Sequence, residues 1–166
     1  MQLQRHHIAQ ANIARGRALL TDPVMSGFVE QLDYMNSVAD RASGFVWRLQ
    51  TEDGDATGIE VFNDPLIILN MSVWESVEDL YEYVFRSDHV GPVKDRRSWF
   101  AKIDRPHSVL WWVRAGTLPT VADAERKLDL LRELGPTPAA FTFTQSFDVS
   151  GRPMVRESRM DRGCGV

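Results

Sequence analysis

Cysteine is almost absent from this chain of 166 residues, which contains Cys164 alone. A single cysteine can form neither a disulfide within the chain nor a thiolate metal cluster, as is typical of a protein from a reducing compartment. The N-terminus lacks the apolar segment of a secretion signal, and apolar runs such as residues 109–113 are far too short to span a bilayer. These absences predict a cytoplasmic protein with no membrane partner.

The chain also has no excess of basic residues. Its 23 Asp and Glu outnumber its 19 Lys and Arg, which gives a net charge of −4. This balance argues against a nucleic-acid partner. The glycine-rich loops of nucleotide-binding proteins and the Gly-x-Ser-x-Gly motif of serine hydrolases are missing. Because no group of His, Asp and Glu has the spacing of metal ligands, we expect no metal site.

Hydrophobic residues make up 43% of the chain and charged residues 25%, proportions that are ordinary for a globular protein. A chain of this length buries a core of its own as a single domain. We expect one α+β domain over residues 1–147. Residues 148–166 are polar and basic, and we expect a C-terminal tail that is either mobile or packed on a partner subunit.

Apolar periodicity and capping residues predict alternating strands and helices. Strands are expected at 7–15, 45–50, 66–73, 107–114 and 141–144, and helices at 23–41, from 76 to a break near 87, at 90–103 and at 121–134. The first elements follow the β-α-β-β-α-β order of the ferredoxin-like fold, to which an extra helix and strand are added.

The strand at 66–73 has two different faces, because its side chains alternate between the two sides of a sheet. One face is wholly apolar, and the other is mixed polar and aromatic, with Asn70, Ser72 and Trp74. The helices cover one face of such a sheet, and no helix is expected to remain for the mixed face. Two sheets that pack face to face across a twofold axis would enclose one cavity per subunit, so we expect a homodimer.

The element order, with Asn12 on the first strand and Trp74 at the start of the helix after the third, resembles the dimeric α+β barrel superfamily. That superfamily includes the antibiotic biosynthesis monooxygenases and the haem-degrading monooxygenases. Segments 9–15, 44–50, 72–76 and 135–143 are more closely similar to one bacterial branch of it, a domain of unknown function. The resemblance spans roughly residues 7–145.

This resemblance implies a cofactor-independent monooxygenase that acts on a small hydrophobic, aromatic or polyketide-like substrate. It needs no metal or flavin, and haem is the alternative cofactor. By analogy with the relatives, His89 would accept a proton, while Asn12 and Asn70 would steady the resulting oxyanion. The simpler interpretation is that the two amides only satisfy their neighbours and that His89 is a solvated residue at a corner of the chain.

The substrate-binding candidates are the other polar and aromatic residues expected on the cavity side. Arg48 requires an anionic partner, which is either an acidic substrate or an ion pair with Glu52 or a partner subunit. Trp74 would form a wall of the pocket. Gln10, Ser72 and Trp112 complete the set.

Two other functions are compatible with the same pocket. A redox-neutral cyclase or isomerase of secondary metabolism would need only shape and preorganised dipoles. A non-enzymatic protein would bind a small ligand, or haem through His89. Separately, the charged run at residues 94–97 is typical of a solvated helix face or of a rim that attracts anions.

Overall fold

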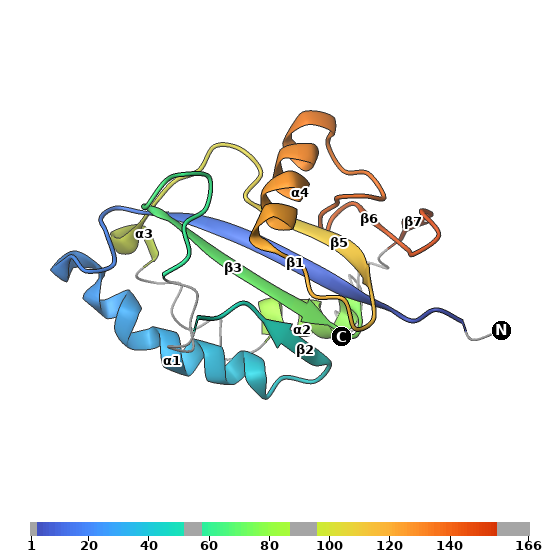
Figure 1. Cartoon of the computed structure of the whole chain (residues 1–166), viewed down its shortest axis with the longest axis horizontal. Coiled ribbons are helices and arrows are strands. Elements are labelled where there is room, and N and C mark those ends of the chain that lie inside the picture. The colour runs from blue at the N-terminus through green and yellow to red at the C-terminus, as the bar shows by residue number, and fades with distance from the viewer. Residues whose placement is uncertain (1–2, 52–57, 87–95, 156–166) are drawn as a thin grey trace, which may run out of the picture.

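The computed structural model describes residues 3–51, 58–86 and 96–155 (Figure 1). The strands are β1 (His6–Gly16), β2 (Phe45–Arg48), β3 (Ile67–Trp74), β4 (Phe100–Ala101), β5 (Ser108–Arg114), β6 (Ser146–Phe147) and β7 (Pro153–Met154). The α-helices are α1 (Ser26–Asp40), α2 (Val77–Arg86), α3 (Arg96–Trp99) and α4 (Val121–Leu134), and a 3-10 turn, Pro23–Met25, precedes α1. Within these ranges, no helix is long and apolar enough to cross a membrane.

The main sheet is antiparallel and places the strands in the order β2-β3-β1-β5. The short strand β4 pairs with the last two residues of β1, beyond the segment that pairs with β5. Each of the two β-α-β units therefore skips one strand position, which is the split arrangement of a ferredoxin-like fold. The predicted α+β, ferredoxin-like fold is confirmed.

The two faces of the sheet are covered by different helices, as Figure 1 shows. Helices α1 and α2 lie on the mixed face, where Val77 and Leu80 pack with Ile8 and Trp74. Helix α4 lies on the apolar face, and it buries Ala124, Leu128 and Leu131 against Leu69, Met71 and Val73. The chain thus covers both faces of its sheet with its own helices.

This arrangement corrects the prediction that no helix remains for the mixed face. The mixed face lies under α1 and α2, and α4 takes the apolar face that those helices leave open. The physical reason for expecting a partner sheet is therefore gone. The homodimer stays a prediction, and the packing of the single chain does not require it.

Several element boundaries differ from the sequence-based expectation. Asp22 caps a 3-10 turn through its contact with the Val24 N–H, and the α-helix begins only at Ser26. Of the helix expected at 90–103, residues 87–95 lie outside the described part, 96–99 are helical, and Phe100 and Ala101 pair with β1. The strand expected at 141–144 is a single bridge between Phe141 and Leu110.

Strands β6 and β7 form a hairpin at the end of the described chain. The boundary expected between domain and tail at residues 147 and 148 falls inside this hairpin. The indole N–H of Trp112 donates a hydrogen bond to the Phe147 carbonyl at 2.8 Å, so the hairpin is anchored to β5. Residues 156–166 lie outside the described range.

Helix α4 begins at Val121, as the sequence predicts, and the structure adds a reciprocal capping box at its start. The Asp123 N–H donates to the Thr120 Oγ1 at 3.1 Å, and the Thr120 N–H donates back to the Asp123 carboxylate at 2.8 Å. We expect Thr120→Val to lower the free energy of unfolding by about 1 kcal/mol, because the hydroxyl acceptor is lost. Thr120→Ser keeps that acceptor and should stay near wild type. Urea denaturation measures both variants, and equal losses would contradict the cap.

Candidate functional site

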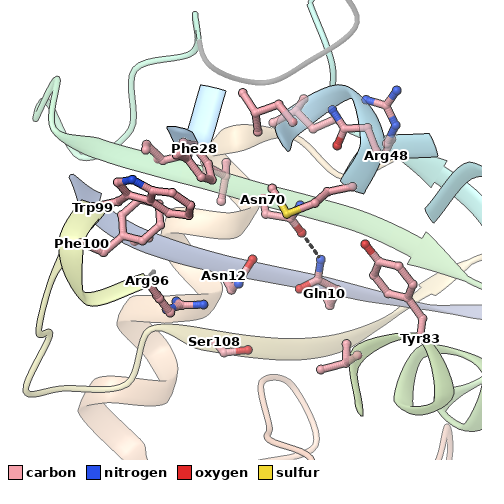
Figure 2. A pocket seen from close by; sticks show the side chains of 18 of the residues that line it. Gln10, Asn12, Phe28, Arg48, Asn70, Tyr83, Arg96, Trp99, Phe100 and Ser108 are labelled. Carbon is pink, nitrogen blue, oxygen red and sulfur yellow. Dashed lines mark hydrogen bonds between the residues drawn. The ribbon is translucent and has the colours of Figure 1, made fainter. Parts of the chain in front are cut away.

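A cavity of about 220 Å³ lies between the mixed face of the sheet and helices α1 and α2 (Figure 2). Its polar lining comes mainly from the strands, and its apolar lining comes largely from the helices and from β4. The lining side chains with polar groups are Gln10, Asn12, Asn36, Arg48, Asn70, Tyr83, Arg96 and Ser108. This volume is below the range of about 300–1,000 Å³ that drug-sized ligands occupy, so the cavity suits a compact molecule.

The floor of the cavity is polar because the strand register brings amides together. Asn12 pairs with Asn70 across β1 and β3, and Gln10 pairs with Ser72 one step further along. The Gln10 Nε2 donates to Asn70 Oδ1 at 2.7 Å and to Ser72 Oγ at 2.8 Å. Both hydrogens of this amide are thus used, and because the Asn70 carbonyl oxygen accepts one of them, the NH₂ group is the donor that Asn70 has to offer.

Asn12 differs from its neighbours because its carbonyl oxygen is not satisfied. Among the residues that the structure describes, the buried Asn12 Oδ1 has no hydrogen-bond partner. Leaving a buried acceptor unpaired costs about 1–3 kcal/mol, so such a group calls for an explanation. Figure 2 shows Asn12 on the cavity floor, between its register partners Asn70 of β3 and Ser108 of β5.

Trp74 lies behind the floor and does not line the cavity. The side chain is fully buried, and its indole N–H donates to Ser72 Oγ at 2.8 Å. Its ring stacks on Tyr83 with centroids 4.8 Å apart and meets Phe45 edge to face. Ser72 is also behind the lining, where its Oγ accepts a hydrogen bond from the Gln10 amide. Trp112 holds the β6–β7 hairpin, and none of these three predicted substrate contacts lines the cavity.

Arg48 is paired by a residue of its own chain. Its Nε donates to Asp40 Oδ1 at 2.7 Å and its Nη2 to Asp40 Oδ2 at 3.3 Å, a two-point contact between β2 and α1. The Arg48 side chain is 13% exposed, whereas that of Asp40 is 44% exposed, so the pair sits at an edge of the cavity. Glu52, the partner considered from sequence, lies outside the described residues.

Tyr83 of α2 is a lining residue that the sequence analysis missed. Burial raises its pKa to about 12, while nearby Arg48 lowers the pKa and Asp40 raises it. At neutral pH the phenol is therefore protonated and can donate a hydrogen bond. The sequence feature that could have predicted this position is the helical spacing, which places Tyr83 on the same face of α2 as the buried Leu80.

The other end of the cavity is aromatic. Phe28, Trp99 and Phe100 gather there in Figure 2, with Phe28 edge to face on Phe100 at 4.9 Å between centroids. The Arg96 guanidinium lies 5.7 Å from the centroid of Phe100. Nothing in the sequence pattern placed these residues together, because they come from α1, α3 and β4.

The proposed proton acceptor, His89, lies outside the described residues. Within the described lining there is no histidine, cysteine or carboxylate. Haem is usually held by an imidazole or a thiolate, so this lining offers no such ligand, and no step is assigned to haem. No group of three or more His, Cys, Asp or Glu in the described ranges is placed to hold a metal ion.

Comparison with known proteins gives a family and several remote structures. The family model described as "Domain of unknown function (DUF3291)" matches residues 7–157. No curated protein matches the chain. Among solved structures, SnoaB, a cofactor-independent oxygenase from Streptomyces nogalater, is 14% identical with a TM-score of 0.41, and the match covers 69% of this chain and 98% of SnoaB.

Two proteins from Nitrosomonas europaea are similarly remote. One, named as an antibiotic biosynthesis monooxygenase, is 16% identical with a TM-score of 0.41, over 71% of this chain and 95% of its own. The other, NE2512, a protein of unknown function, is 10% identical with a TM-score of 0.44, over 71% of this chain and 99% of its own. Likenesses this remote do not bear on the reaction.

Proposed function

This chain belongs to the family described as a domain of unknown function (DUF3291), and we propose that it is an enzyme acting on a small hydroxylated aromatic molecule in the cavity. The observation that carries the proposal is the buried, unpartnered Oδ1 of Asn12 on the cavity floor. A hydroxyl group of the substrate would donate to this oxygen, and its ring would lie against the aromatic end of the cavity.

The floor is arranged to favour the deprotonated form of such a substrate. The Asn70 amide oxygen accepts from Gln10 and the residue lines the cavity, so its NH₂ group would donate to a developing oxyanion. Tyr83 remains protonated, so it adds no negative charge to the lining, and the positive charge of Arg96 favours the anion. Preformed dipoles of this kind stabilise an enolate or phenolate without reorganising.

The reaction we propose is a monooxygenation that uses the electrons of the substrate itself. Molecular oxygen adds to the electron-rich carbon of the deprotonated ring system. One oxygen atom stays in the product as a new ring carbonyl, and the substrate hydroxyl becomes a second carbonyl. The other oxygen atom leaves as water with the C–H hydrogen of the attacked carbon and the hydrogen of the hydroxyl group. The proton acceptor we propose is His89, as the family resemblance implies.

Binding without turnover is the second candidate, and one observation favours it. The described lining contains no carboxylate or imidazole that could act as a general base. Such a pocket can hold a ligand, or guide a redox-neutral cyclisation or isomerisation, through shape and hydrogen bonding alone.

The binding part of the proposal can be tested with 1-naphthol and naphthalene, which differ by one hydroxyl group. We expect wild type to bind 1-naphthol about tenfold more tightly, and Asn12→Leu to abolish that difference, because the partner of the hydroxyl is removed. Asn36→Leu, which removes another lining amide, is the matched control and should keep the preference. Equal affinity of wild type for both ligands would overturn the assignment of Asn12.

The reaction is tested with ¹⁸O₂ and a panel of hydroxylated anthracenes and naphthalenes. Label in the product, with oxygen consumed in equal amount, is the outcome expected of a monooxygenase. An unlabelled, isomerised or cyclised product would assign redox-neutral chemistry instead. Saturable binding with no product from any panel member under air would favour the binding protein.

A further inference from the structure

A second recess of about 610 Å³ opens beside the cavity and is strongly basic. Its charged side chains are Arg17, Arg96, Arg97 and Lys102, with His107 at one side. No carboxylate belongs to the lining among the residues that the structure describes. Ala14, Arg96 and Phe100 border both hollows, so the recess and the cavity are neighbours.

The basic side chains of the recess are partly held in place. The Arg17 Nε donates to the Arg97 carbonyl oxygen at 2.7 Å, which fixes the guanidinium and leaves its two terminal nitrogens for another acceptor. The Arg17 backbone N–H donates to the Trp99 carbonyl oxygen at 2.8 Å, so the residue that follows β1 is tied to α3. Arg96 packs over Phe100 at 5.7 Å from the ring centroid.

This concentration of positive charge is unusual in a chain whose net charge is −4. Four permanent cations converge on one hollow, and they repel one another with no acidic group in the described lining to compensate. Of these four, Lys102 forms an ion pair with the exposed Asp104 at 3.5 Å. A folded protein that maintains such repulsion gains stability when an anion enters.

We propose that this recess is a binding site for a phosphate group. Arginine guanidinium groups recognise phosphate through two parallel hydrogen bonds, and several of them together favour a dianion over a single carboxylate. Arg96 lines both hollows, whereas Arg17, Arg97 and Lys102 line the recess alone, so Arg97 and Lys102 are the positions that test the recess separately from the cavity.

Titration of the full chain with inorganic phosphate at pH 8, at constant ionic strength maintained with NaCl, tests the proposal by ³¹P NMR line broadening. Wild type should bind phosphate saturably, and pyrophosphate more tightly. Arg97→Gln and Lys102→Gln should each raise the Kd for phosphate about tenfold, because each removes a charge-assisted contact. Arg114→Gln removes the same charge from an exposed position at the last residue of β5, whereas His107 of the recess lies just before the first. This variant should leave the Kd for phosphate unchanged.

Thermal unfolding without phosphate checks that the variants fold. Because neutralising one cation relieves repulsion, Arg97→Gln should unfold at or above the wild-type unfolding temperature. If Arg97→Gln unfolds at a lower temperature, the effect on the Kd for phosphate is judged from Lys102→Gln. The proposal is overturned if wild type shows no saturable phosphate binding, if Arg114→Gln weakens binding as much as Arg97→Gln, or if acetate competes as well as pyrophosphate.

Discussion

Replacing Trp74 by alanine should lower the free energy of unfolding by about 4 kcal/mol, the loss typical of a buried tryptophan. The side chain is fully buried between Tyr83 and Phe45, with which it makes stacked and edge-to-face contacts. Truncation would leave a large hole behind the cavity floor. It would also take from Ser72 Oγ the indole N–H that it accepts at 2.8 Å. Urea denaturation followed by far-UV circular dichroism measures the change.

Two further variants separate packing from hydrogen bonding. Trp74→Phe keeps most of the ring and removes the N–H, so it should cost about 1–2 kcal/mol. Tyr34→Ala truncates an aromatic side chain that is 51% exposed, and it should change stability much less than Trp74→Ala. If the free energy of unfolding of Trp74→Ala lies within about 1 kcal/mol of the wild-type value, the packing of this ring does not stabilise the fold to the expected extent.

Trp74→Phe also distinguishes the observed position from the one expected from sequence. The structure places this ring behind Gln10 and Ser72, so the affinity for 1-naphthol should stay within a factor of about two of wild type. A tenfold loss of affinity in a variant of near-wild-type stability would instead place the indole against the ligand.

The sequence predicted strands β1, β2, β3 and β5 of the main sheet and the two faces of β1 and β3, because side-chain alternation is a local property of an extended chain. It also predicted where α4 begins, since Thr120 and Asp123 form a capping box without help from distant residues. Asn12, Asn70, Gln10 and Arg48 were assigned to the cavity side on the same grounds, and all four line the cavity.

The failures concern contacts between residues that are distant in sequence. The amphipathic pattern of α4 shows that it needs a partner surface, but not which sheet face it covers, and this error led to the argument for a dimer. Trp74 occupies the mixed face as expected, yet the side chain is long enough to turn under Ser72 and Tyr83 rather than into the cavity. The Asp40 partner of Arg48 likewise depends on how α1 crosses β2.

Above pH 10, wild type should lose stability because of Tyr83. Burial raises the pKa of this phenol to about 12 in the folded chain, whereas an unfolded tyrosine titrates near 10. Between these values the unfolded chain releases the proton and the folded chain keeps it. The contribution of protonated Tyr83 to the free energy of unfolding is therefore complete below pH 10 and declines as the pH rises toward 12. At pH 11.5 the free energy of unfolding of wild type should be about 2 kcal/mol lower than at pH 9 because of Tyr83.

Tyr83→Phe removes the titrating group and should therefore remove this part of the alkaline loss. The stability difference between wild type and Tyr83→Phe, measured by urea denaturation, should be constant up to pH 9 and then shift in favour of the variant. Tyr34→Phe alters an exposed phenol and should parallel wild type throughout. Parallel curves for Tyr83→Phe would mean that the phenol ionises near pH 10. In that case the floor would be wetter than the buried Asn12 Oδ1 indicates, and hydrogen bonds from the amides to a ligand oxyanion would be correspondingly weaker.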